Sequence, residues 1–122
     1  MTSAATRAAL VALSAARPAI ARLDRSRDPE DLAADIIEGW SGVESALRTL
    51  LGGSEASGTD LIHEASQAGL VTLAQANALA AFHAARDRAH DTSYRPTDAD
   101  LGAAREAFLK LETALLATGE LP

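Results

Sequence analysis

The feature that most constrains the fold is the spacing of large apolar residues in the second quarter of the chain. Between residues 32 and 50 they recur at steps of four, four, three, four and three. On an α-helix this spacing places all of them on a single face over roughly five turns. A helix of this length with one apolar face needs partner elements to cover it. The residues are Leu32, Ile36, Trp40, Val43, Leu47 and Leu50.

The ends of this helix are also marked in the sequence. Asp28 can cap it, and Pro29 suits its first position because proline lacks the backbone donor that stays unpaired there. The two glycines at residues 52–53 are expected to stop it. Gly39 and Gly42 lie in its middle, where a glycine costs about 1 kcal/mol relative to alanine. Their presence therefore indicates close packing of another helix at this point.

Four further segments have helical patterns. The first covers about residues 3–23 and contains Pro18, which removes one backbone donor and predicts a kink or a break there. The second covers residues 60–68 and stops at Gly69. The third begins at a capping box formed by Thr72 and Gln75. The fourth begins at Thr97 and Asp100 and ends at Gly119.

No segment shows the alternation of apolar and polar residues that is typical of a strand. Aromatic residues make up only 3%, so the core must consist of Leu, Ile, Val and Ala, and alanine has the best intrinsic helix propensity. We therefore expect an all-α fold, an up-and-down bundle of four to five helices in a single domain over residues 1–122. Within it, residues 1–27 are expected to form a kinked N-terminal helix and its connector, and residues 28–118 the bundle core.

Charge and composition narrow the classes of function. The formal net charge of −6 disfavours RNA as a partner, because nucleic-acid binding usually rests on a basic surface. The absence of cysteine excludes disulfides, thiolate metal sites and cysteine nucleophiles. His63 and Glu64 have no second histidine at ligand spacing, so we expect neither a metal nor a cofactor. No apolar run has the length of a membrane span or a secretory signal, so we expect a cytoplasmic protein without a membrane partner.

Ionisable residues gather in one short stretch, HAARDRAHD, within the fourth predicted helix. Each helical residue turns by about 100°, so Arg86 and His90 lie about 40° apart, with His83 one turn before Arg86. These three side chains are expected at one edge of the apolar face, where another helix, a dimer partner or a ligand would make contact. Asp87 and Asp91 are neighbours on the more polar side.

This stretch has two interpretations. Arg86 and His90 would suit cleavage of a phosphodiester, because arginine holds phosphate in a bidentate fork and histidine exchanges protons near neutral pH. Alternatively, they are polar interface residues at a helix C-terminus, where cations are favoured. Tyr94 and Arg95 follow on a loop and either close over the cluster or anchor the next turn. The predicted binding residues are His83, Asp87, Asp91, Tyr94 and Arg95.

The region from about residue 35 to residue 115 resembles HEPN-like helical domains. The resemblance rests on Trp40 and Glu44 in IIEGWSGVESALRTLL, on the connector AGLVTLAQANAL, and on an Arg-polar-…-His pattern in the later helix. The ribonuclease motif of that family is an arginine, a polar residue directly after it, and a histidine that follows the arginine after four to six intervening residues. Here Arg86 and Asp87 match its start, but His90 comes too early and Asp91 occupies the next position. The resemblance therefore implies a degenerate motif, and it implies a homodimer in which the motif helices face each other.

These observations predict a non-catalytic HEPN-like interaction module that acts as a homodimer, with a further protein as a second kind of partner. The alternative is a metal-independent HEPN-type ribonuclease of the toxin or antiviral-defence class. In that case Arg86 would bind phosphate and His90 would act as acid or base at the dimer interface. A bundle that binds a small nucleotide between its helices is a third alternative, and the sequence leaves open whether the protein is an enzyme.

Overall fold

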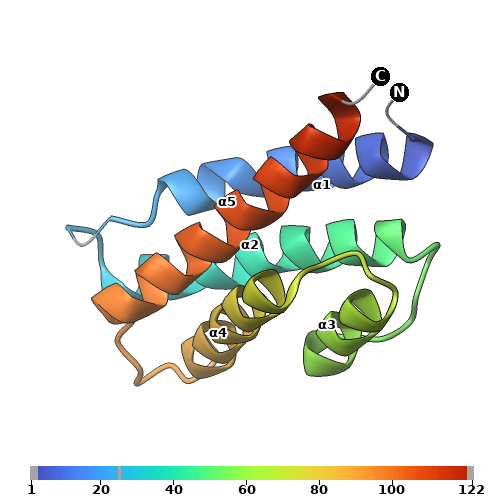
Figure 1. The fold of residues 1–122 in the computed structure, drawn as a ribbon. Helices are drawn as coiled ribbons and strands as arrows, with labels where there is room; N and C mark the ends of the chain where they lie inside the picture. The colour runs from blue at the N-terminus through green and yellow to red at the C-terminus, as the bar shows by residue number, and fades with distance from the viewer. Residues whose placement is uncertain (1–2, 25, 121–122) are drawn as a thin grey trace.

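The computed structural model describes residues 3–24 and 26–120, and this part of the chain consists of helices without any strand (Figure 1). The expected all-α bundle is therefore confirmed, with five helices in the described residues. Their bounds are α1 Ala4–Ala21, α2 Pro29–Leu50, α3 Gly58–Gln67, α4 Leu73–Ala89 and α5 Asp98–Glu120.

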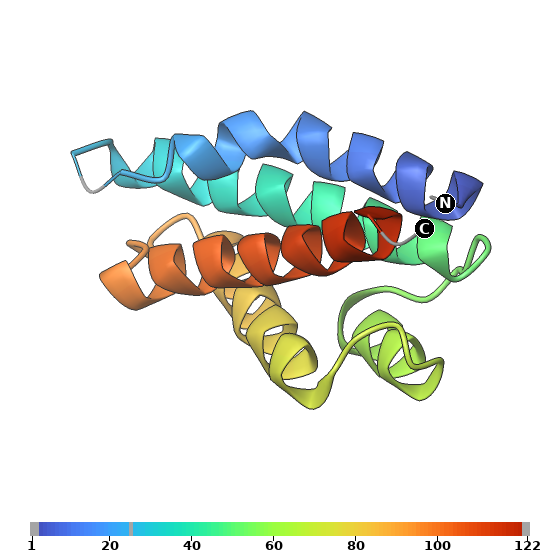
Figure 2. The same ribbon diagram turned by 45° about the horizontal axis from the view of Figure 1, so that its top comes forward.

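The longer helices form two antiparallel pairs that pack on each other. The first pair is α1 and α2, and the second is α4 and α5, which also lies against α1 (Figures 1 and 2). The short helix α3 sits at the periphery, beside α4 and the end of α2. The beginning of α1 and the end of α5 lie at the same corner of the molecule.

Two glycines on α2 allow α1 and α4 to come close. A Cβ atom at Gly42 would lie 2.3 Å from the Cβ atom of Ala16 on α1. A Cβ atom at Gly39 would lie 2.8 Å from Ile20 Cδ1 and 3.3 Å from Phe82 Cζ on α4. The close helix packing that the sequence indicates at these two positions is therefore confirmed.

The helix α1 continues through Pro18 to Ala21 without the break that was one of the two expectations. Pro18 lies in the last turn, so only one intrahelical hydrogen bond is lost, and its ring is exposed to solvent. The amide of Arg22 donates to the Pro18 carbonyl over 3.1 Å and so completes the final turn. Of the expected N-terminal region 1–27, the structure describes residues 3–24 and 26–27, and within these the helix covers Ala4–Ala21. Residues 1, 2 and 25 lie outside the described part of the chain.

The N-terminal helix shares one core with the rest of the bundle. Its buried residues include Leu13 and Ile20, which belong to the same apolar cluster as α2, α4 and α5. Arg17 forms an ion pair with the buried Glu112 on α5, and its guanidinium carbon lies 5.5 Å from the centre of the Phe108 ring. α1 therefore contributes both apolar and polar contacts to the bundle.

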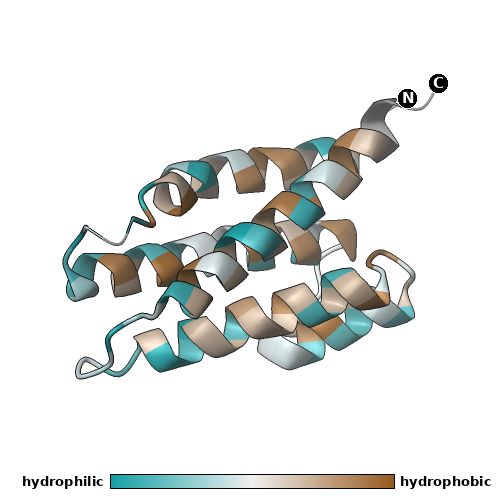
Figure 3. Cartoon of the chain, turned by 60° about the vertical axis from the view of Figure 1, so that its left-hand side comes forward, coloured by the Kyte–Doolittle hydropathy of each residue, from teal (hydrophilic) through white to brown (hydrophobic). Residues whose placement is uncertain are grey.

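Trp40 occupies the middle of this core and is 2% exposed, as the apolar stripe predicts. Its ring packs edge-on against Phe82 with 5.4 Å between the ring centres. Apolar residues recur along the helices, and the connections from α1 to α2 and from α4 to α5 are mainly polar (Figure 3). The Trp40–Phe82 contact joins α2 to α4, the helix that carries the ionisable stretch.

Most of the capping contacts predicted at the helix starts are confirmed. Thr72 and Gln75 form a reciprocal capping box at the start of α4. At the start of α5, Thr97 Oγ1 accepts from the Asp100 amide and an Asp100 carboxylate oxygen accepts from the Thr97 amide. Asp28 stands at the N-cap of α2, but its side chain makes no capping hydrogen bond. The Asp28 carboxylate is therefore exposed at the surface without a capping contact.

Candidate functional site

A groove of about 790 Å³ lies between the first turns of α2 and the connection from α4 to α5. Four predicted site residues line it, namely His90, Asp91, Tyr94 and Arg95. We call it the α2–α4 groove. Its other lining residues are Asp28, Pro29, Glu30, Ala33, Ala34, Ile37, Ala89, Thr92 and Ser93.

The residues that follow the end of α4 form the polar side of this groove. Ala89 is the last helical residue, and His90 is the C-cap, so the exposed imidazole leaves the helix at the rim of the groove. Asp91 then forms a tight turn, in which it accepts from the amide of Ser93 over 2.9 Å and from its hydroxyl over 2.7 Å. These hydrogen bonds lower the pKa of Asp91 below its ordinary value.

Tyr94 is anchored by a polar cluster between α4 and α5. Its hydroxyl donates to the buried Asp100, which also accepts from Arg88 and from the amide of Thr97. Burial raises the pKa of Asp100, but these three hydrogen bonds outweigh it and hold the pKa below its ordinary value. The hydrogen bond to Asp100 raises the pKa of Arg88. Of the two roles considered for Tyr94, the structure shows that it anchors the turn, and its side chain also lines the groove.

The rim of the groove carries more negative than positive charge. Three carboxylates line it, those of Asp28, Glu30 and Asp91, against the single guanidinium of Arg95. Asp28, Glu30 and Arg95 make no side-chain hydrogen bond or ion pair with any residue that the structure describes. The floor is apolar, so the groove combines a hydrophobic base with a rim of unpaired charges.

A second polar cluster surrounds Trp40 of α2. The α4 residues that belong to it lie about one helical turn before the α4 residues that line the groove. Glu44 Oε2 accepts from the Trp40 indole over 3.1 Å and from the Gly58 amide over 3.0 Å. Its other oxygen pairs with Arg48 over 3.0 Å. Glu44 therefore forms its ion pair with a residue one turn later on its own helix.

His83 belongs to this second cluster. Its ring centre lies 5.1 Å from that of Trp40, and its Nε2 atom lies 3.6 Å from a carboxylate oxygen of Asp87. A Cβ atom at Gly58 would lie 2.8 Å from the same Nε2 atom, and Gly58 has a φ of +56°. The imidazole is thus packed between α2, α3 and α4.

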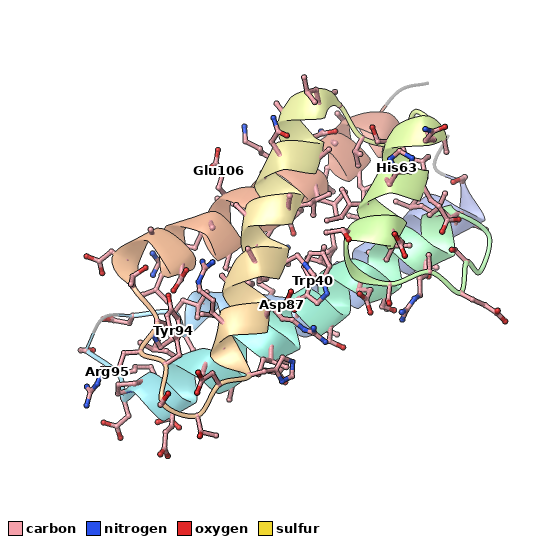
Figure 4. The ribbon with its side chains drawn as sticks, turned by 90° about the horizontal axis from the view of Figure 1, so that it is seen from below. Trp40, His63, Asp87, Tyr94, Arg95 and Glu106 are labelled. Atoms are coloured by element: carbon pink, nitrogen blue, oxygen red, sulfur yellow. The ribbon has the colours of Figure 1, made fainter. Side chains whose placement is uncertain are left out.

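Arg86 points to the same region as His83 and does not line the groove. Its Nη1 atom donates to Asp87 over 3.0 Å, and its buried Nε atom has no hydrogen-bond partner among the described residues. The structure therefore divides the predicted residues into two sets. His83, Arg86 and Asp87 lie beside Trp40, whereas His90, Asp91, Tyr94 and Arg95 line the groove (Figure 4).

The α2 side of the groove was not predicted from the sequence. Asp28 was interpreted only as a helix cap, and Ile37 lies next to the main apolar stripe. One signal was available, because Ala33 and Ile37 are four residues apart and form a second apolar edge on α2. The sequence gives no sign that this edge meets residues 89–95.

Another surface of the molecule carries uncovered leucines. A shallow hollow of about 420 Å³ lies between the first turn of α4 and the second half of α5, and Leu109 lines it. Leu73 and Leu116 neighbour other lining residues of this hollow in the sequence. The three residues are 76%, 55% and 47% exposed in the order Leu73, Leu109 and Leu116. We call them the leucine surface.

The described residues contain no group of three or more acidic or histidine side chains that could hold a metal ion. His63 contacts Gln67 on its own helix and lies away from the end of the molecule that carries Tyr94 and Arg95 (Figure 4). Within the described part of the chain, no helix has both the length and the apolar character that crossing a membrane requires.

Comparisons of this chain with protein-family models, with curated proteins and with solved structures find no match.

Proposed function

We propose that this chain is a non-catalytic helical interaction module that acts as a homodimer. The observation that carries the proposal is the leucine surface, on which Leu73, Leu109 and Leu116 are each about half exposed or more. Large apolar side chains grouped on a surface are typical of protein–protein contacts. Leu109 and Leu116 are seven residues apart on α5, so they lie on the same face of that helix.

Charge supports a second copy as the occupant of the leucine surface. Its hollow is lined by one charged residue, Lys110, which also pairs with Glu106 over 3.8 Å. Two copies with a net charge of −6 each repel one another least where they meet through a nearly neutral surface. The acidic groove is at the other end of the 17-residue helix α4, about 25 Å away along its axis.

The contacts of Arg86 favour a non-catalytic role. A phosphate-binding arginine needs its donors directed at the substrate, but the Arg86 guanidinium is bound to the carboxylate of Asp87. His90 stands at a rim with three carboxylates, which repel a phosphodiester. The HEPN-like relationship is part of this proposal, and its support is the helical fold with Trp40 and Glu44 on α2 and the degenerate motif on α4.

Size-exclusion chromatography with light scattering tests the dimer. We expect the wild-type chain of 12.6 kDa to elute at twice its monomer mass, and Leu109→Glu and Leu116→Glu to elute as folded monomers. Val11→Glu is the matched control, since Val11 is 69% exposed on α1 and does not belong to the leucine surface. A monomeric wild type, or a dimer that tolerates both α5 substitutions, would overturn the proposed interface.

An RNA cleavage assay tests the absence of catalysis. We expect no cleavage of a structured RNA by the purified dimer, with or without added divalent metal. Cleavage that is lost in both Arg86→Ala and His90→Ala, while circular dichroism shows an intact fold, would establish the ribonuclease alternative and reject the present proposal.

A further inference from the structure

We propose that the α2–α4 groove docks a basic amphipathic segment of a partner protein. In this arrangement an apolar side chain of the segment enters the groove, and flanking lysine or arginine residues contact the acidic rim. The site is separate from the leucine surface, so this docking is independent of the proposed homodimer.

The floor of the groove suits an apolar anchor. Ala33, Ala34 and Ile37 of α2 line it together with Ala89 at the end of α4. Three of these four side chains end at Cβ, so two helices meet here without filling the space between them. A volume of about 790 Å³ lies in the range of natural ligand sites and accepts a leucine or phenylalanine side chain together with adjacent backbone.

The charges on the rim indicate that the partner segment should be positively charged. Asp28 and Glu30 are exposed and have no intramolecular partner among the described residues, in contrast to Asp35 and Asp100, which each pair with arginine. Asp91 adds a third carboxylate, and hydrogen bonds from Ser93 hold it in place at the edge of the groove.

The partial charges at the ends of two helices contribute to the electrostatic potential at the same rim. The C-terminal end of α4, which carries partial negative charge, lies at the groove beside His90. Asp28 and Glu30 offset the partial positive charge at the start of α2. Arg95 is the one permanent cation on the lining and extends outward in Figure 4. The groove as a whole therefore favours cationic over anionic side chains.

The same charges argue against the other occupants. A nucleic acid would bring phosphates to three carboxylates, and a second copy of this chain would bring another acidic rim. A positively charged peptide has the complementary charge and also supplies the apolar anchor.

Selection from a library of random short peptides on the immobilised 122-residue chain tests this proposal. We expect enriched peptides to carry a large apolar residue flanked by lysine or arginine. The blocking variant is Ala34→Arg, which fills the floor and adds a positive charge at an exposed helical position. Ala8→Arg is the matched control, because Ala8 is also an exposed helical alanine, on α1.

An enriched peptide should bind the wild type and Ala8→Arg equally and Ala34→Arg at least about tenfold more weakly. The double variant Asp28→Asn/Glu30→Gln should weaken binding about threefold to tenfold at low salt and less at high salt, because exposed charges are screened. No enrichment over the Ala34→Arg background, enrichment of acidic peptides, or equal binding to Ala34→Arg would each overturn the proposal. Because the leucine surface is unchanged in all these variants, a negative result here leaves the dimer test intact.

Discussion

At the scale of single residues, Glu44 links three parts of the chain through one carboxylate. It accepts from the indole of Trp40 in the core and from the amide of Gly58 at the start of α3, and it pairs with Arg48 on its own helix. The Gly58 contact matters for the position of α3, because this short helix is peripheral. Glu44 is therefore a structural residue that joins the core to the α2–α3 connection.

Replacing Glu44 by alanine leaves the Trp40 and Gly58 donors without an acceptor in a partly buried site. We expect Glu44→Ala to lower the free energy of unfolding by about 1–3 kcal/mol, measured by urea denaturation followed by circular dichroism. The control is Glu55→Ala, since Glu55 is exposed and makes no hydrogen bond or ion pair within the described residues. Equal stability of the two variants would show that the Glu44 contacts contribute nothing.

At the scale of helices, the close contact of α1 with α2 depends on small residues. Gly42 faces Ala16, and the absence of side-chain atoms at this point lets the two backbones approach. Gly102 on α5 presents the opposite situation, because a Cβ atom there would meet nothing within 4 Å. The two glycines lie in helices of similar length, but Gly42 packs against a neighbouring helix and Gly102 does not.

These two positions give opposite predictions for the same substitution. Gly102→Ala should raise the free energy of unfolding by about 0.5–1 kcal/mol, because alanine is the better helix former and restricts the unfolded chain. Gly42→Ala should lower it by about 1–3 kcal/mol, since the added methyl group forces α1 away from α2. Thermal unfolding of both variants measures the difference, and stabilisation by Gly42→Ala would show that the helices are not tightly packed there.

At the scale of the whole molecule, stability depends on pH through the buried carboxylate of Asp100. Asp100 joins the end of α4 to the start of α5, and folding lowers its pKa below the ordinary value of 3.8. A carboxylate whose pKa is lowered by folding stabilises the native state above its unfolded pKa. This contribution is lost as the pH falls through the lower, folded pKa.

We therefore expect the wild type to be more stable than Asp100→Asn at neutral pH, by roughly 1–3 kcal/mol. The difference should shrink as the pH falls below about 4, which urea denaturation over a pH series measures. Asp60→Asn is the comparison, because Asp60 is exposed and has no hydrogen bond or ion pair within the described residues. A stability difference that stays constant down to acid pH would contradict the role of the Asp100 carboxylate.

The sequence by itself determined the helices, because the interactions that define them are local. The periodic apolar residues of α2, the capping box of Thr72 and Gln75 and the pair of Thr97 and Asp100 all act within a few residues of one another. The continuation of α1 through Pro18 was less predictable, because it depends on how near proline lies to the end of the helix.

Only the tertiary structure decided which ionisable residues share a site. Helical spacing places Arg86 and His90 on one edge of α4, but Asp87 binds the arginine and the helix ends at the histidine. The groove forms from residues 28–37 and 89–95, which are distant in sequence and meet because α2 and α4 pack around Trp40. Periodicity reports which face of a helix is buried, whereas the identity of the neighbour across that face depends on the packing of the whole chain.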